Sequence, residues 1–173
     1  MKIELTTGMH KRDIEAIAAY LREHPKEMKK MVSIALTNEM TPSMKASWII
    51  STASVQQKGC LNAYLDDIIL ALPNISTSGT RRELLKALLH NDFSKSDHLG
   101  ALVDTVFTFM RRTTDDLAVS YNSVKVMQKI IKQYPDLKAE FDAILQEQME
   151  YGSETWRKLA KHVMKKTGVR NKE

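Results

Sequence analysis

Apolar residues recur at three- and four-residue spacing along almost the whole chain. This spacing places side chains on one face of an α-helix, and no stretch keeps the two-residue alternation of a β-strand. Near the C-terminus, for example, Trp156, Leu159, Ala160 and Val163 fall on one helical stripe. Only six Gly and four Pro residues interrupt the pattern. The sequence therefore predicts an all-α fold of roughly nine helices joined by short turns.

Turn and capping residues divide this pattern into separate helices. Pro25 suits the first turn of a helix, and Thr41 followed by Pro42 predicts another helix start. Gly59 and Gly152 mark breaks. The predicted helices lie at about residues 13–22, 25–35, 41–59, 61–72, 76–91, 97–110, 115 or 116–134, 135–151 and 154–166.

The spacing of equivalent positions in these helices indicates a repeat. Trp48 and Leu85 hold the same place in their helices, 37 residues apart, and a step of 38 residues from Leu85 reaches Ser123. A period near 40 in paired helices is typical of an α-solenoid. One amphipathic pair cannot bury its apolar stripe alone, whereas stacked pairs give every stripe a neighbour. We therefore expect an α-α superhelix of stacked antiparallel helix pairs.

Three runs at this period, TPSMKASWII, TSGTRRELLKALL and DDLAVSYNSVKVM, carry a resemblance to a known family. Each has a short polar turn followed by a leucine-rich or otherwise apolar helical face. Over about residues 25 to 150 the sequence resembles the HEAT and armadillo-like repeat proteins. The resemblance implies a non-catalytic scaffold or adaptor that mediates protein–protein interaction on the surface formed by successive second helices.

Two adjacent arginines open the second of these runs. The resemblance implies that a basic residue here pairs with an acidic residue of a neighbouring turn, and Arg82, like Lys45, matches that position. The third run has Ser120 instead, and we expect Arg81 to be solvated. Both arginines oppose the helix dipole, so an acidic group or a bound anion must offset them. We interpret them chiefly as scaffold, with residual potential for binding. The residues expected to contact a partner are Lys45, Arg81, Arg82 and Lys125.

Composition is that of one ordinary globular domain. With 43% hydrophobic and 27% charged residues in 173, we expect a single helical repeat domain over residues 1–166 and a flexible basic tail over 167–173. Cys60 is the single cysteine, which excludes an internal disulfide and fits a reducing cytoplasm. The sequence shows no secretory h-region and no apolar stretch long enough for a membrane span.

The positive charge is concentrated at the C-terminal end. The formal net charge is +5, but the last 17 residues carry seven Lys or Arg and one Glu, so the residues before them sum to −1. The last predicted helix combines an apolar stripe with basic residues at the other positions, a pattern that either caps the last repeat or binds acidic partners, phosphates or anionic membranes. The alternative function is nucleic-acid binding, including that of a DNA-repair glycosylase built on HEAT-like repeats. Against it, only 6% of residues are aromatic, which leaves little for stacking on bases. The basic residues of this helix are Arg157, Lys158, Lys161, Lys165 and Lys166.

Candidate catalytic and metal-binding residues are few. The run HNDFSKSDH contains His90, Asp92, Asp97 and His98, but its spacing does not place them on one helix face, and we interpret it as an interhelical loop. Cys60 has no catalytic motif around it. The adjacent pairs Asp66-Asp67 and Asp115-Asp116 do not face one another on a helix. We therefore expect no cofactor, no metal and no enzymatic activity.

Overall fold

A computed structural model describes residue 5, residues 7–111 and residues 117–167, with the side chains of 166 and 167 excepted. All regular structure in these ranges is helical, which confirms the predicted all-α superhelical fold class. The chain divides into two compact units, Met1–Leu102 and Val103–Glu173. This division does not test the single domain predicted over residues 1–166, which stays a prediction.

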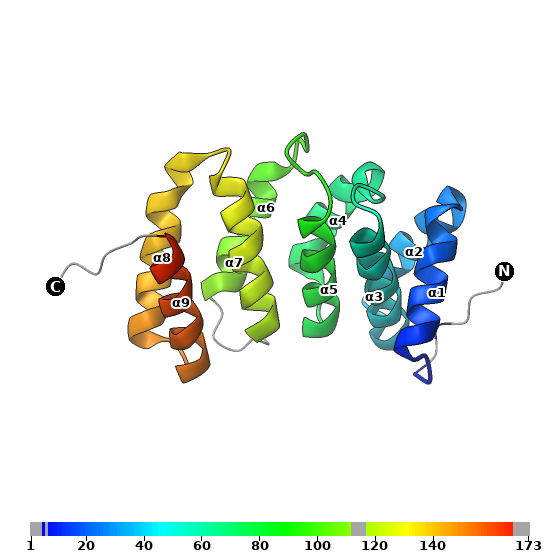
Figure 1. The fold of residues 1–173 in the computed structure, drawn as a ribbon, viewed down its shortest axis with the longest axis horizontal. Helices are drawn as coiled ribbons and strands as arrows, with labels where there is room; N and C mark the ends of the chain where they lie inside the picture. The colour runs from blue at the N-terminus through cyan, green and yellow to red at the C-terminus, as the bar shows by residue number, and fades with distance from the viewer. Residues whose placement is uncertain (1–4, 6, 112–116, 168–173) are drawn as a thin grey trace. The chain divides into compact units, whose positions relative to one another are not determined.

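The first unit is built from stacked helix pairs. In it α3 packs against both α1 and α5, and α2 packs against α3. In Figure 1, α1, α3 and α5 stand in one row, with α2 and α4 behind them. The elements of this unit are α1 (Lys11–Arg22), α2 (Pro25–Ala35), α3 (Met40–Gln56), the 3-10 turn η1 (Asn62–Tyr64), α4 (Leu65–Ala71), the 3-10 turn η2 (Leu72–Asn74) and α5 (Ser78–Leu89).

Polar contacts of α3 with α5 and with the segment directly after α5 agree with the 37-residue step of the repeat. The hydroxyl of Ser43 lies 3.3 Å from that of Thr80, and the Asn91 amide donates to Ser54 Oγ at 3.0 Å, both across 37 residues. Equivalent residues of successive repeats are therefore in direct contact. The further step from Leu85 to Ser123 joins residues of different units and stays a prediction.

The turns of the first unit are joined at a similar spacing. Asn38, between α2 and α3, donates from its amide to the carbonyl of Asn74 at 3.0 Å. Its side-chain oxygen accepts from the backbone N–H of Ser76 at 2.8 Å. One asparagine thus satisfies backbone groups of the next repeat's turn, groups that no helix or strand ladder would pair.

The second unit places α9 on α8 and α7. Its core includes Phe141 of α8 and Trp156 of α9, both buried. An ion pair of 3.0 Å between Arg111 and Glu140 joins α6 to α8. The elements are α6 (Leu99–Arg111), which crosses the boundary between the units, α7 (Leu117–Ile131), the 3-10 turn η3 (Pro135–Leu137), α8 (Lys138–Tyr151) and α9 (Glu154–Thr167).

Several predicted helix boundaries were wrong. Helix α3 begins at Met40, with Glu39 as its N-cap, rather than at Thr41. Pro42 is nevertheless compatible, because the first N–H groups of a helix have no intrahelical acceptor and Pro lacks an N–H. The helix predicted at 61–72 is α4 alone, flanked by 3-10 turns on both sides. The helix predicted to start at Asp115 or Asp116 has its start outside the described residues.

Candidate interaction surface

The two arginines at the start of α5 are tied to their own surroundings. Arg81 Nε donates to the carbonyl of Ile75 at 2.8 Å, and its side chain is half-buried. The prediction that Arg81 is solvated was therefore wrong, because this carbonyl lies in the turn just before α5 and takes the guanidinium inward. Arg82 does pair with an acid, Glu83, at 3.2 Å. That acid is the next residue of the same helix.

Glu83 is the group that offsets the positive charge at this helix start. It is 7% exposed, and its second carboxylate oxygen lies 3.7 Å from Lys86 Nζ. A buried carboxylate requires charged partners. Arg82 and Lys86 supply them, so this cluster contributes to the scaffold of α5.

Lys45 does not lie on the surface predicted for it. Only 8% of the residue is exposed, and its Nζ donates to the carbonyl of Met9 at 3.0 Å. The ammonium also lies 5.5 Å from the centre of the Trp48 ring, within the range of a cation–π contact. Lys45 thus holds the segment before α1 against α3, and we leave it out of the interaction surface.

Lys125 is exposed on α7, as its predicted role requires. Its Nζ lies 4.2 Å from the centre of the Tyr121 ring, one helical turn earlier. Gln128 follows on the same helix face, and Lys132 lies at the same spacing directly after the last residue of α7, Ile131. Both reach solvent. We call Tyr121, Lys125, Gln128 and Lys132 the α7 stripe. Only Lys125 was singled out from the sequence, although the i, i+4, i+7, i+11 spacing could have identified the other three.

Helix α9 buries one face and exposes the other. Its apolar stripe packs inward, with Trp156 only 2% exposed, so this stripe is not available to a partner. Four of the five predicted basic residues, Arg157, Lys158, Lys161 and Lys165, are exposed. The side chain of Lys166 and the predicted tail beyond Thr167 lie outside the described residues.

The exposed cations of α9 differ in how they are engaged. Arg157 donates to the carbonyl of Gly152 at 2.8 Å, and Lys158 pairs with Glu154 at 2.7 Å. Lys161 and Lys165 make no ion pair with any residue that the structure describes. These two lysines are the most accessible positive charges of the helix.

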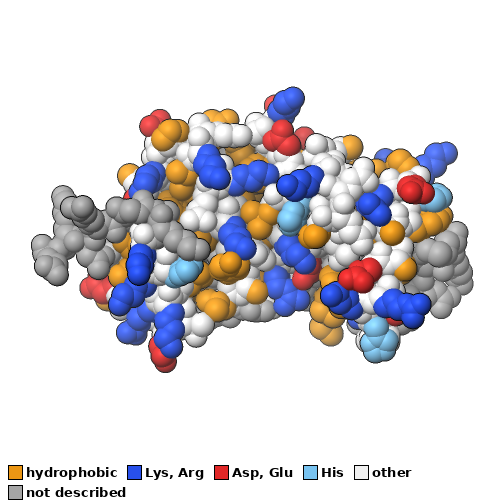
Figure 2. Space-filling view, viewed as in Figure 1, with side chains coloured by type: hydrophobic (Ala, Val, Ile, Leu, Met, Phe, Trp, Pro, Cys, Tyr) orange, Lys and Arg blue, Asp and Glu red, His pale blue; other side chains and the backbone are white. Residues whose placement is uncertain are grey.

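Charge is divided unevenly among the helices of the second unit. Helices α7 and α9 together contain seven Lys or Arg and one Glu, whereas α8 contains one Lys and four acidic residues. Because α7 and α9 are in contact, these cations lie on neighbouring helices. Figure 2 shows Lys and Arg side chains over these two helices and also elsewhere on the same face. We call the exposed cations of α7 and α9, Lys125, Arg157, Lys158, Lys161 and Lys165, the basic surface.

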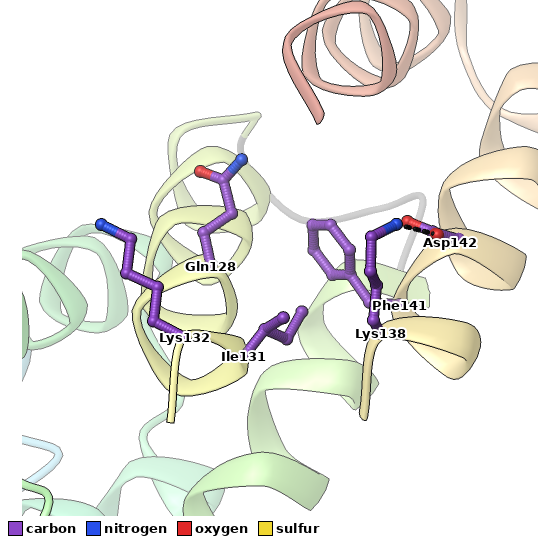
Figure 3. A pocket seen from close by; sticks show the side chains of 6 residues that line it. All are labelled: Gln128, Ile131, Lys132, Lys138, Phe141 and Asp142. Carbon is purple, nitrogen blue, oxygen red and sulfur yellow. Dashed lines mark hydrogen bonds and ion pairs between the residues drawn. The ribbon is translucent and has the colours of Figure 1, made fainter. Parts of the chain in front are cut away.

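A pocket of about 380 Å³ opens between α7 and α8 beside this surface. Figure 3 shows Gln128 and Ile131 on the α7 side facing Phe141 and Lys138 on α8. Phe141 forms an apolar wall, and Lys138 pairs with Asp142. The lining residues are Gln128, Ile131, Lys132, Lys138, Phe141 and Asp142.

The other candidate residues have structural surroundings. Asp92 Oδ1 accepts from the backbone N–H of Ser94 at 3.1 Å, which is a turn contact and agrees with the predicted loop. Asp66 accepts from the hydroxyl of Ser96. The Cys60 thiol is half-buried, and burial raises its pKa. A raised pKa leaves less thiolate and argues against a nucleophile. Asp115 and Asp116 lie outside the described residues.

Two further properties of the described residues concern metal binding and membrane insertion. In the ranges that the structure describes, no three His, Cys, Asp or Glu side chains come close enough together to hold a metal ion. No helix in those ranges combines the length and apolar character that crossing a bilayer requires.

Comparison with known proteins gives one match. A family model described as a HEAT repeat domain matches residues 1–167. This range is wider than the resemblance over residues 25 to 150 that the three sequence runs indicated. No curated protein and no solved structure matches the chain.

Proposed function

Because the chain belongs to the HEAT repeat family, whose members are helical repeat scaffolds, we propose that it is a non-catalytic adaptor that binds an acidic protein. The basic surface of α7 and α9 makes the contact. Arg81 and Arg82 support the first unit and act on partner binding only through its stability.

The uneven division of charge within the second unit supports this proposal. Packing requires only that each helix bury its apolar stripe, and it sets no sign for the charges on the outer positions. Lysines gathered on neighbouring helices repel one another, whereas an interspersed arrangement would not. A complementary acidic surface relieves this repulsion and is steered toward the site by the same field.

Nucleic acid is the second candidate, and the exposed Lys161 and Lys165 favour it as well, because phosphates attract the same charges. Protein binding is preferred because α9 offers no base-stacking platform and the exposed Tyr121 ring of α7 is already in contact with Lys125. Its aromatic residue, Trp156, is buried in the core, whereas single-stranded nucleic acid is bound largely by stacking on aromatic rings.

Photo-crosslinking from α9 tests the proposal in cells that express the protein natively. A photoreactive amino acid replaces the exposed His162, and a control replaces the exposed Gln146 of the acidic helix α8. We expect a discrete, protease-sensitive adduct from position 162 and none from position 146. A nuclease-sensitive adduct would instead establish the nucleic-acid candidate, and no adduct from position 162 would refute a partner on α9.

A charge-reversed variant sharpens this test. Lys161→Glu with Lys165→Glu should abolish the adduct from position 162. Lys26→Glu with Lys29→Glu, which makes the same charge change on exposed positions of α2, should leave it intact. Equal loss in both variants would show that net charge matters rather than the basic surface.

A further inference from the structure

We propose that the pocket between α7 and α8 takes one apolar side chain from an acidic, extended segment of the protein partner. The α7 stripe binds the acidic residues on either side of that side chain. This inference rests on the proposed function, because it specifies which chemical groups of the protein partner bind to the second unit.

The walls of the pocket suit an apolar group. Phe141 lines the pocket but is only 1% exposed, so the half-buried Ile131 opposite it supplies more of the apolar surface that a ligand can reach. The methylene chains of Lys132 and Lys138 complete the lining. The volume of about 380 Å³ falls within the range of roughly 300–1,000 Å³ found for small-molecule sites. One Leu, Met or Phe side chain therefore fits with room to spare.

Charges around the pocket favour acidic neighbours for that side chain. Lys138 is already paired with Asp142, so this pair adds little net charge at the opening. Lys132 is exposed and makes no ion pair with any described residue. Lys125 lies two turns earlier on the same stripe, and together the two lysines make the α7 side of the opening positive.

The spacing of the two lysines sets the spacing of the acidic groups. Seven residues of α-helix span about 10 Å along the axis, and an extended chain covers the same length in about three residues. Gln128 lies between the lysines and offers amide donors and acceptors to a peptide backbone. The favoured ligand is therefore an extended segment with acidic residues about three positions apart and an apolar residue between them.

A nucleic acid fits this pocket less well. Phosphates would find the two lysines, but a base or sugar in the pocket would meet apolar walls that cannot satisfy its polar edges. An acidic peptide can place charge on the stripe and hydrocarbon in the pocket at the same time.

Titration with short peptides tests the inference on the full chain. The probe is a fluorescent Glu-Glu-Leu-Glu-Glu peptide, compared with Glu-Glu-Ala-Glu-Glu, by anisotropy at low and high salt. We expect the Leu-to-Ala change to weaken binding about tenfold or more, because most of a buried side chain is lost. Backbone amide resonances of Gln128, Ile131 and Phe141 should shift on addition of the Leu peptide.

Two protein variants locate the binding site. Lys132→Glu reverses an exposed charge and should weaken the Leu peptide by about threefold to tenfold at low salt. Gln128→Trp should fill the opening and abolish the preference for Leu over Ala. Lys26→Glu on α2 is the matched charge control and should bind like the unaltered protein.

The outcomes separate this inference from the proposed function. If the two peptides bind equally, if neither binds, or if the resonance shifts are confined to α9, the pocket assignment is wrong. The crosslink from position 162 decides the proposed function independently. If a DNA duplex shifts the pocket resonances and the Leu peptide does not, the pocket belongs to a nucleic-acid site and the inference is overturned.

Discussion

The side chain of Asn91 joins three segments of the first unit, and replacing it with Ala should destabilise the protein strongly. Its oxygen accepts from the backbone N–H of Leu61 at 2.9 Å. Its amide donates to Ser54 Oγ at 3.0 Å and to the carbonyl of Ala87 at 2.7 Å. Asn91 is 2% exposed, so water cannot take over these bonds without opening the packing.

The expected cost follows from which groups lose their partner. Leu61 is buried, and its N–H has no other acceptor among the described residues once the Asn91 oxygen is removed. An orphaned buried donor costs about 1–3 kcal/mol. Ser54 still donates to the carbonyl of Ile50, so its loss is smaller, about 0.5–1.5 kcal/mol, as for an ordinary hydrogen bond. The total is about 1.5–4.5 kcal/mol, which lowers Tm by roughly 3–18 °C for a chain of this size.

Thermal unfolding followed by circular dichroism measures this change, with Asn74→Ala as the control. Asn74 is exposed and uses its backbone carbonyl in the contact with Asn38, so its Ala variant should stay within about 0.5 kcal/mol of the unaltered protein. Hydrogen exchange at the Leu61 amide should accelerate in Asn91→Ala. Equal stability of the two variants, with unchanged exchange at Leu61, would refute the reasoning.

Three further predictions concern single positions. Gly152→Ala should destabilise by about 1–3 kcal/mol, because a Cβ there would lie 2.4 Å from the backbone oxygen of Gln148; an unchanged urea midpoint would contradict this. Arg81→Ala removes the hydrogen bond to the Ile75 carbonyl and should lower the free energy of unfolding in urea by about 1.5–3 kcal/mol. The affinity for the Leu peptide should not change. Weaker peptide binding by the folded variant would return Arg81 to the interaction surface. Burial raises the pKa of Cys60, so the rate of its alkylation by iodoacetamide should rise at a higher pH than that of a free cysteine. A pH profile of this rate with its midpoint at about 8.5, as for a free cysteine, would show an unperturbed thiol.

The fold was largely predictable because each helix of the repeat is marked by its own apolar spacing and turn residues. Apolar stripes fixed the helices, and Pro25 marked the start of α2 correctly. The step from Trp48 to Leu85 matched the offset that the Ser43 and Thr80 contact shows in space. Helix boundaries were predicted wrongly where several start positions are compatible with the same residue, as they are near Pro42. Tertiary contacts such as that of Asn62 with the N–H of Asp92 then shape the segment before α4.

The interaction residues were less predictable, for reasons that differ by residue. Lys45 precedes Ile49 by four positions and Ala53 by eight, so it shares a helical face with two buried residues; its burial was visible in the pattern. Arg81 bonds to a backbone carbonyl six residues earlier, and no residue pattern marks such an acceptor.

The pocket could not have been predicted from a single helix. Ile131 and Phe141 come from α7 and α8, and their apolar character alone would assign both to the core. The gap between them depends on how closely the two helices approach each other, which is a tertiary property. Sequence reasoning could find the exposed α7 stripe but not the cavity at its end.

In the proposed function, recognition by the second unit is divided between two kinds of residue. The lysines of α9 act through a field that reaches about 8 Å at physiological salt and carries little information about shape. They can raise the rate of encounter with an acidic partner but cannot select among acidic partners. The pocket makes only short-range contacts, and it favours a partner that presents an apolar side chain at the correct position. Selectivity among acidic proteins therefore depends on the pocket, because the basic surface attracts all of them.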